Sequence, residues 1–122
     1  MRNNHGIMKR DIIALLFIML SFSVYSLSPS VGGYNVYYGH LHNHTSFSDG
    51  SGTPDQAYTT AKANGLDFLG LSDHSHLLSD AEWTATLDAA EMYNSENVFT
   101  TFRGFEWTSG TYGHVTVVNT PT

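Results

Sequence analysis

The chain contains no cysteine among its 122 residues. This absence excludes disulfide bonds, thiolate metal sites, a cysteine nucleophile and a lipoprotein-type lipid anchor. The sequence also lacks a GxxxxGK[ST] phosphate-binding loop and a GxSxG nucleophile motif. Neither P-loop nucleotide binding nor covalent acyl-enzyme chemistry is therefore indicated.

Basic residues are scarce, with five Lys and Arg against eleven Asp and Glu and a formal net charge of -6. After residue 26 only Lys62 and Arg103 remain to oppose ten acids, which gives about -8. A nucleic-acid binder needs a basic surface to neutralise phosphates, so we expect no nucleic-acid partner. A phosphorylated small molecule stays compatible, because bound metal ions can supply positive charge.

Long hydrophobic runs are absent as well. Lys9–Arg10 precede an apolar run at Ile12–Leu20 of about nine residues, whereas a membrane span needs about 20. This pattern predicts a signal peptide over residues 1–26, with Met8 as an alternative start. We therefore expect a periplasmic or extracellular protein that leaves the membrane after cleavage; a retained membrane anchor is the alternative.

Beyond the signal, residues 27–34 are polar and rich in Gly, Pro and Ser, which is typical of a linker, and residues 35–122 form one domain. Alternation and short apolar runs predict four strands, at about Asn35–His42, Leu66–Leu71, Val98–Phe105 and His114–Asn119.

Two helices are expected between these strands. Thr53 is a good N-cap with Gln56 three residues later, and Ser79 with Glu82 forms a second capping box. Gly65 is a suitable terminator for the first helix. Alternation of strands and helices is the α/β pattern, which favours a parallel sheet.

Polar residues follow the first three strands. Active sites of α/β barrels gather at the carboxyl ends of parallel strands. Core packing does not require histidines or carboxylates at three successive strand ends, so a functional site is indicated. The residues are His42, His44 and Asp49 after strand one, Asp73, His74 and His76 after strand two, and Glu106 after strand three.

His42 and His44 have one residue between them, so on extended backbone they point to the same side and can chelate one ion. His40 shares this parity but lies deeper in the strand, where a supporting hydrogen-bonded role competes with ligation. Asp49 stands in an Asp-Gly turn dipeptide, so a turn role competes with a ligand role.

Asp73 could orient an imidazole, as carboxylates beside metal-bound histidines do. Glu106, between two aromatic residues, is costly to bury unless it binds metal or pairs, for example with Arg103. His114 at the next strand is a ligand candidate, and His76 either binds substrate or caps a turn. Trp83 and Trp107 are expected to be core or wall residues.

Histidines and carboxylates in this arrangement suit two or three divalent ions, Zn, Mn or Fe. The chemistry to expect is hydrolysis by a metal-activated water, with a small-molecule substrate.

The stretch HNHTSFSDGSGTPDQAYTTAKANGLDFLGLSDH, followed by GFEW and GHVTVVN, resembles the PHP (polymerase and histidinol phosphatase) metallohydrolase family, and its carbaryl-hydrolase-like branch in particular. The resemblance covers about residues 36–121. It implies a distorted (β/α)7 barrel and a metal-dependent hydrolase of phosphoesters or related esters and carbamates. The implied metal ligands are His42, His44, Asp49, His74, Glu106 and His114.

The family pattern continues with further histidines and an Asp-x-His motif that this chain lacks. We therefore expect an N-terminal fragment with about half of the barrel, which would be inactive alone. Two other interpretations stay open: an amidohydrolase-type (β/α)8 barrel, and an exported metal-binding module without catalysis.

Overall fold

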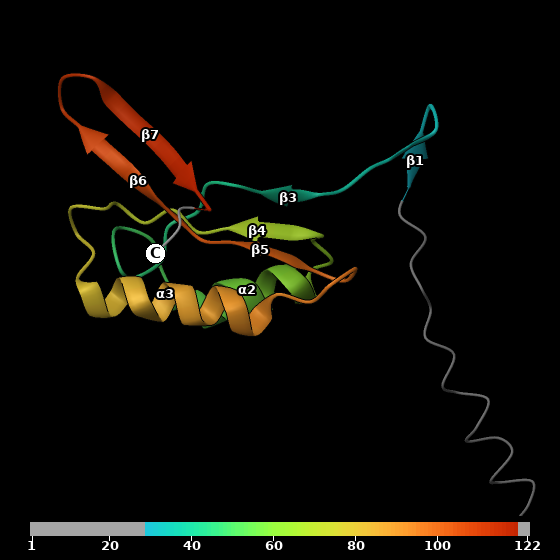
Figure 1. Cartoon of the computed structure of the whole chain (residues 1–122), viewed down its shortest axis with the longest axis horizontal. Coiled ribbons are helices and arrows are strands. Elements are labelled where there is room, and N and C mark those ends of the chain that lie inside the picture. Colours follow the sequence, from blue (N-terminus) through green and yellow to red (C-terminus); the bar gives the residue numbers. More distant parts are fainter. Residues whose placement is uncertain (1–28, 120–122) are drawn as a thin grey trace, which may run out of the picture.

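The computed structural model describes residues 29–119 (Figure 1). The predicted signal peptide and Met8 lie outside this range. The elements are β1 (Ser30–Val31), β2 (Tyr34–Asn35), β3 (Gly39–His40), α2 (Pro54–Ala63), β4 (Phe68–Gly70), α3 (Asp80–Tyr93), β5 (Thr100–Phe102), β6 (Gly104–Ser109) and β7 (Gly113–Val118).

A three-stranded parallel sheet, in the order β3-β4-β5, forms the centre of the fold. Gly39 pairs with Phe68 and Leu69 pairs with Thr101. Helices α2 and α3 make the two crossovers, and both lie on the same face of the sheet (Figure 1). The predicted α/β class with a parallel sheet is confirmed.

Both helices begin where their capping residues predict. The Thr53 side chain accepts a hydrogen bond from the Gln56 N–H, and the Gln56 side chain accepts one from the Thr53 N–H. Ser79 and Glu82 make the same reciprocal pair at the start of α3. Gly65 follows α2 with a φ of 78°, the left-handed conformation that glycine adopts without strain.

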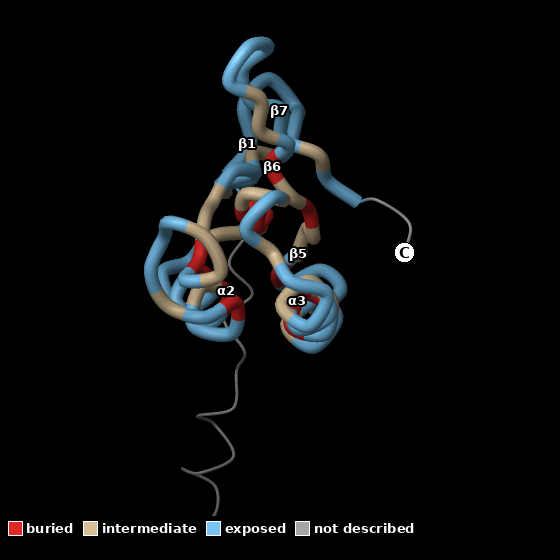
Figure 2. Tube along the Cα trace, turned by 90° about the vertical axis from the view of Figure 1, so that its left-hand side faces the viewer, coloured by how far each residue is buried: buried red, intermediate tan, exposed pale blue. Residues whose placement is uncertain are grey.

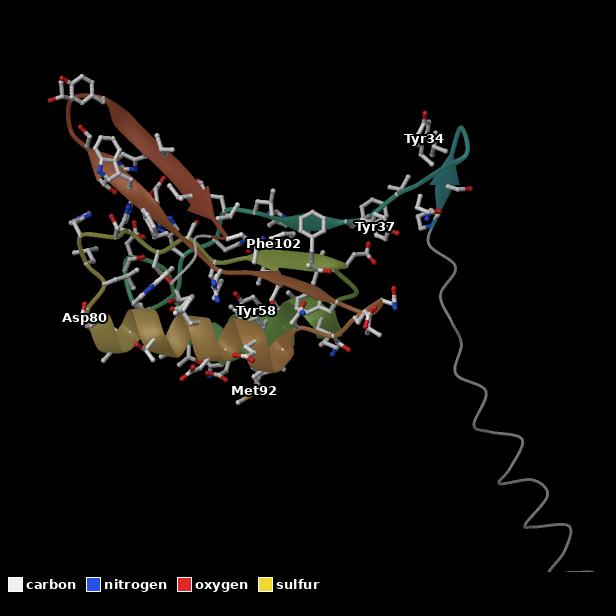
Figure 3. The ribbon with its side chains drawn as sticks, viewed as in Figure 1. Tyr34, Tyr37, Tyr58, Asp80, Met92 and Phe102 are labelled. Carbon is white, nitrogen blue, oxygen red and sulfur yellow. The ribbon has the colours of Figure 1, made fainter. Side chains whose placement is uncertain are left out.

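The hydrophobic core lies between the helices and the sheet, where Figure 2 shows the buried segments facing inward. Tyr58 of α2 is fully buried, stacks on Tyr93 of α3 and meets Phe99 edge-on. Its hydroxyl donates to the Phe102 carbonyl, so this core residue, labelled in Figure 3, also connects α2 to the sheet.

The first strand differs from the prediction. Of the predicted strand, residues 39 and 40 alone pair in the sheet, whereas Asn35 pairs with Ser30 in a small hairpin that lies mostly in the predicted linker. Gly32 and Gly33, with φ of 60° and 86°, form its turn, so glycines that indicated a linker instead permit a tight reversal.

The third predicted strand, Val98–Phe105, is wrong as a single element. The chain pairs with β4 through Phe102 and then leaves the sheet at Gly104 to form the antiparallel β6–β7 hairpin. A Cβ on Gly104 would lie 2.2 Å from the Val117 carbonyl oxygen and 3.2 Å from that of Leu71. The junction between the two sheets therefore requires glycine.

The β6–β7 hairpin extends from the end of the parallel sheet (Figure 1). Its register pairs Glu106 with Thr116 and Thr108 with His114. Because side chains alternate along a strand, these four residues share one face, and Trp107 lies on the other. Within residues 29–119, no helix combines the length and apolarity that crossing a membrane requires.

Candidate metal centre

Three segments meet at the carboxyl end of the parallel sheet. His42 and His44 come from the chain after β3, His74 from the chain after β4, and Glu106 from β6. His74 and Glu106 form an isolated parallel bridge, and the Ser75 N–H donates to the Glu106 carbonyl. The backbone of the β4 and β6 segments is thereby in fixed register where the polar side chains converge.

Glu106 is the centre of this cluster. Its side chain is 7% exposed, and four imidazoles surround its carboxylate. The nitrogen-to-oxygen distances are 2.8 Å for His74 Nδ1, 3.2 Å for His114 Nδ1, 3.5 Å for His44 Nε2 and 3.6 Å for His42 Nε2. Four neighbouring imidazoles therefore accompany the burial of this carboxylate.

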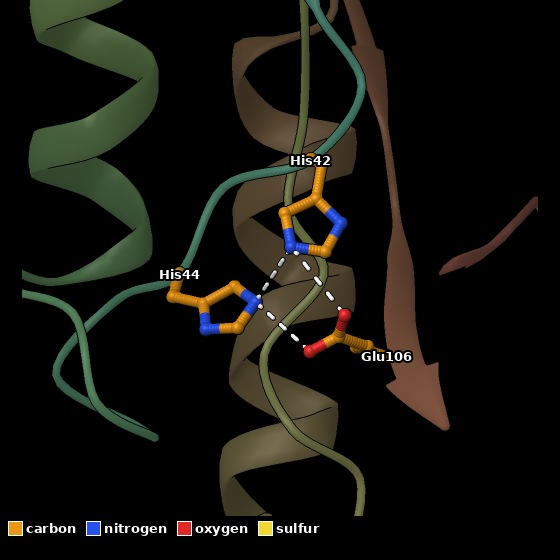
Figure 4. Close-up of side chains that lie close together, drawn as sticks. All are labelled: His42, His44 and Glu106. Carbon is orange, nitrogen blue, oxygen red and sulfur yellow. Dashed lines mark hydrogen bonds and ion pairs between the residues drawn. The ribbon is translucent and has the colours of Figure 1, made fainter. Parts of the chain in front are cut away.

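His42 and His44 point to the same side, as their spacing predicts. Their Nε2 atoms lie 3.1 Å apart and both face the Glu106 carboxylate (Figure 4). The two ring centroids are 4.9 Å apart, so the imidazoles converge on a point between the three side chains.

Asp49 lies in a turn, and its carboxylate also belongs to the cluster. The turn role and the candidate ligand role are therefore compatible. Its Oδ1 is 2.5 Å from His44 Nδ1, and its Oδ2 is 3.5 Å from His74 Nε2. The hydrogen bond with His44, followed by the nearby imidazole charges, lowers the pKa of Asp49 although desolvation opposes this. The carboxylate is therefore held in its ionised form, which is the form that binds metal.

The six predicted ligands form three overlapping groups in which one donor atom per residue lies within 4.8 Å of the others. Glu106, His44 and His74 each belong to two groups. The groups are His42, His44 and Glu106; His44, Asp49 and His74; and His74, Glu106 and His114.

Two threonines on the same hairpin face contact the histidines, and neither was predicted from the sequence. Thr116 Oγ1 lies 2.5 Å from His42 Nδ1, and Thr108 Oγ1 lies 2.8 Å from His74 Nδ1. Each stands two residues from Glu106 or His114, so strand parity could have indicated them. With Nδ1 of His42 hydrogen-bonded, its Nε2 is free to face the cluster.

Among the described residues, the hydrogen bonds to the Asp73 carboxylate come from Thr45 and Ser48 and not from an imidazole. The carboxylate is buried, and its donors are the Thr45 N–H, the Thr45 hydroxyl and the Ser48 hydroxyl. The carboxylate faces the loop after β3 because Asp73 and His74, as neighbours on extended backbone, point to opposite sides.

Other candidates lie around the cluster. His40 is exposed and joins none of the three groups. His76 is exposed at the edge, with its ring centroid 5.5 Å from that of His74. Trp83 is half-buried and packs edge-on against Phe105 outside the hydrophobic core, and Trp107 is 44% exposed.

Comparison with solved structures gives one similar protein, a candidate metal-dependent phosphoesterase from Bifidobacterium adolescentis. It is 28% identical, with a TM-score of 0.46, over 66% of this chain. The chain spans about a quarter of that protein's length, 27%. Among curated proteins, none matches.

The sequence profile of the PHP domain family matches residues 40–115, from His40 to one residue beyond His114. The match includes every residue of the three His and carboxylate groups. The chain belongs to the PHP domain family.

Proposed function

We propose that the chain provides the metal centre of a PHP-type hydrolase that uses two or three divalent ions, Zn, Mn or Fe. The observation that carries the proposal is Glu106, a buried carboxylate shared by four imidazoles. The proposed ligands are His42, His44, Asp49, His74, Glu106 and His114.

The donor spacing fits this proposal. Two ligand atoms that each lie about 2.0–2.1 Å from one zinc ion in tetrahedral geometry are about 3.3 Å from each other. The Nε2 atoms of His42 and His44 are 3.1 Å apart, and their distances to the Glu106 oxygens are 3.6 and 3.5 Å. Imidazole nitrogen and carboxylate oxygen are also the ligand types that these ions accept.

Each protein group has a distinct part in this proposal. Glu106 offers one oxygen to the His42 side and the other to the His44, His74 and His114 side, so it suits a bridging position. Thr116 holds Nδ1 of His42 and leaves Nε2 directed at Glu106. Bound ions would acidify a water molecule and stabilise the negative charge that develops during hydrolysis.

The proposed substrate is a small molecule with a phosphoester, or a related ester or carbamate, as in the carbaryl-hydrolase-like branch. The chain has few lysines and arginines, so attraction of an anionic substrate would depend on the metal ions. Substitution of a ligand should therefore remove both metal and turnover.

The test is metal analysis and hydrolysis assays with His42→Ala, His44→Ala and Glu106→Ala in the full-length protein. We expect each variant to lose bound metal and hydrolysis of a panel of phosphoesters and carbamates. Unchanged metal content and activity in all three would refute the proposal. Tight metal binding by the full-length protein with no hydrolysis across the panel would instead favour a non-catalytic metal-binding module.

We propose in addition that the chain is exported, because Lys9–Arg10 and the short apolar run after them match a signal peptide. Expression in a bacterial host should give a product that begins at Leu27. A product in the cytoplasm with an intact amino terminus would contradict this.

A further inference from the structure

Asp73 is not one of the six proposed ligands, but it is 1% exposed and directly precedes His74 in the chain. Its carboxylate receives three short hydrogen bonds, at 2.6 Å from the Thr45 N–H, 2.8 Å from the Thr45 hydroxyl and 2.6 Å from the Ser48 hydroxyl. A buried carboxylate is costly unless it is compensated, and hydrogen bonds to an ionised acceptor are stronger than neutral ones. These three hydrogen bonds, the Asp73 clamp, therefore hold the loop after β3 that contains Thr45 and Ser48.

The clamped loop carries two of the proposed ligands. Thr45 directly follows His44, and Ser48 directly precedes Asp49. The loop is tightly closed, since the Thr45 carbonyl accepts hydrogen bonds from the N–H groups of Ser48 and Gly50. A Cβ on Gly50 would lie 2.2 Å from the His44 carbonyl oxygen, so the loop has little space to rearrange.

Asp73 also connects to the other two ligand segments through its backbone. Its carbonyl accepts a hydrogen bond from the Glu106 N–H at 2.9 Å, and its peptide bond leads directly to His74. One residue thus contacts the loop of His44 and Asp49, the strand of Glu106 and the backbone of His74. The side-chain clamp sets the distance between the first segment and the other two.

We propose that Asp73 is a positioning residue that brings Asp49 and His44 to His74, and so completes the metal group formed by these three residues. The inference rests on the proposed metal-binding function. It predicts that the clamp acts on metal binding through Asp49 and His44, with no contact between Asp73 and the ion.

The experiment is a titration of the full chain with Co²⁺, followed by visible absorption, for the unaltered protein, Asp73→Asn, Asp49→Asn and the double variant. Loss of outer hydrogen-bond partners of ligands lowers metal affinity by about 10–100-fold, and we expect this for Asp73→Asn. Because Asp49 is one of the two ligands that Asp73 positions, the effects should not add: Asp73→Asn should weaken binding less in the Asp49→Asn background than in the unaltered chain.

Asp67→Asn is the matched control. Asp67 precedes β4, its carboxylate accepts a hydrogen bond from the Tyr38 N–H at 2.7 Å, and it lies at the opposite end of the strand from the cluster. Its substitution changes a comparable carboxylate-to-backbone contact and should leave Co²⁺ affinity unchanged. Circular dichroism of each variant measures folding separately.

Ser48→Ala decides the question if Asp73→Asn does not fold, because it removes one donor and leaves the carboxylate with two. We expect weaker Co²⁺ binding in this variant with unchanged circular dichroism. Co²⁺ affinity equal to that of the unaltered chain in folded Asp73→Asn, or in Ser48→Ala, would overturn the inference while leaving the metal site in place. Failure of the unaltered chain to bind Co²⁺ would overturn the proposed function itself.

Discussion

The pair of His42 and Thr116 shows how single side chains prepare the candidate metal centre. An imidazole has two nitrogens, and the hydrogen bond made by one decides which nitrogen is available as a ligand. Here the Thr116 hydroxyl takes Nδ1, and Nε2 is left opposite His44 and Glu106. The orientation of the ring thus depends on a residue outside the proposed ligand set.

Thr116→Val should weaken metal binding, because it keeps the shape of the side chain and removes the hydroxyl. An effect of about 10–100-fold on affinity is expected for a partner of this kind. Thr116→Ser restores the hydroxyl and should retain the affinity of the unaltered chain. Zn²⁺ titration by calorimetry measures both, and equal affinity for Val and Ser would contradict this role.

A second residue-scale prediction concerns Tyr58. Burial, and then the nearby charge of Asp73, raises the pKa of its phenol, so the hydroxyl stays protonated and donates to the Phe102 carbonyl. That carbonyl also accepts from the Leu71 N–H, so Tyr58→Phe leaves it with one partner. We expect a loss of about 1 kcal/mol in the free energy of unfolding, measured with urea.

At the scale of elements, the two helices depend on their capping boxes. The Ser79 N–H and hydroxyl both donate to the Glu82 carboxylate at the start of α3. The backbone hydrogen bond from Ser79, followed by the one from its side chain, lowers the pKa of Glu82 from its ordinary value of 4.5. The ionised form is thus favoured by the folded state.

This shift predicts a pH dependence of stability. Since the folded-state pKa is lowered, the stabilisation is fully present above pH 4.5 and is lost as the pH falls through the lowered pKa. Glu82→Gln keeps a side-chain oxygen that can accept the capping hydrogen bond from Ser79, but it has no charge that titrates. The difference in free energy of unfolding between the unaltered chain and Glu82→Gln should therefore favour Glu at pH 7 and decrease on acidification; a constant difference would contradict it.

The junction between the parallel sheet and the β6–β7 hairpin gives a second element-scale prediction. Gly104→Ala would push a methyl group into the Val117 carbonyl, at a cost of about 1–3 kcal/mol that thermal unfolding can measure. Gly110→Ala in the hairpin turn is the control, because a Cβ there meets nothing within 4 Å and the φ of Gly110 is not positive. Similar melting temperatures for the two variants would argue against a constrained junction.

At the scale of the whole molecule, patterns local to the sequence predicted most of the fold. Capping residues and apolar spacing predicted both helices, and strand parity predicted that His42 and His44 point together. The split at Gly104 was not predictable from local pattern, because the close contact that requires glycine there involves a carbonyl 13 residues later. Likewise, no local pattern indicates that Asp73 faces Thr45, since that contact joins residues 28 positions apart.

The positions after or within strands marked His42, His44, Glu106 and others as candidates, and the resemblance to the PHP family supplied the full set of six, which the structure brings together. Their ligation of metal stays a prediction. The residues that support them were missed. Thr108, Thr116 and the Asp73 clamp depend on the hairpin register and on the closed loop, which are known only once the segments are packed together.

The proposed function depends on metal ions bound by the cluster around Glu106. The most direct measurement is the number of Zn²⁺, Mn²⁺ or Fe²⁺ ions bound per chain after equilibrium dialysis, for the unaltered protein and for Glu106→Gln. Gln has the size of Glu but cannot balance the charge of two cations, so we predict two or three ions in the unaltered chain and a clear loss in the variant. No bound metal in the unaltered chain, or equal numbers in both proteins, would contradict the account.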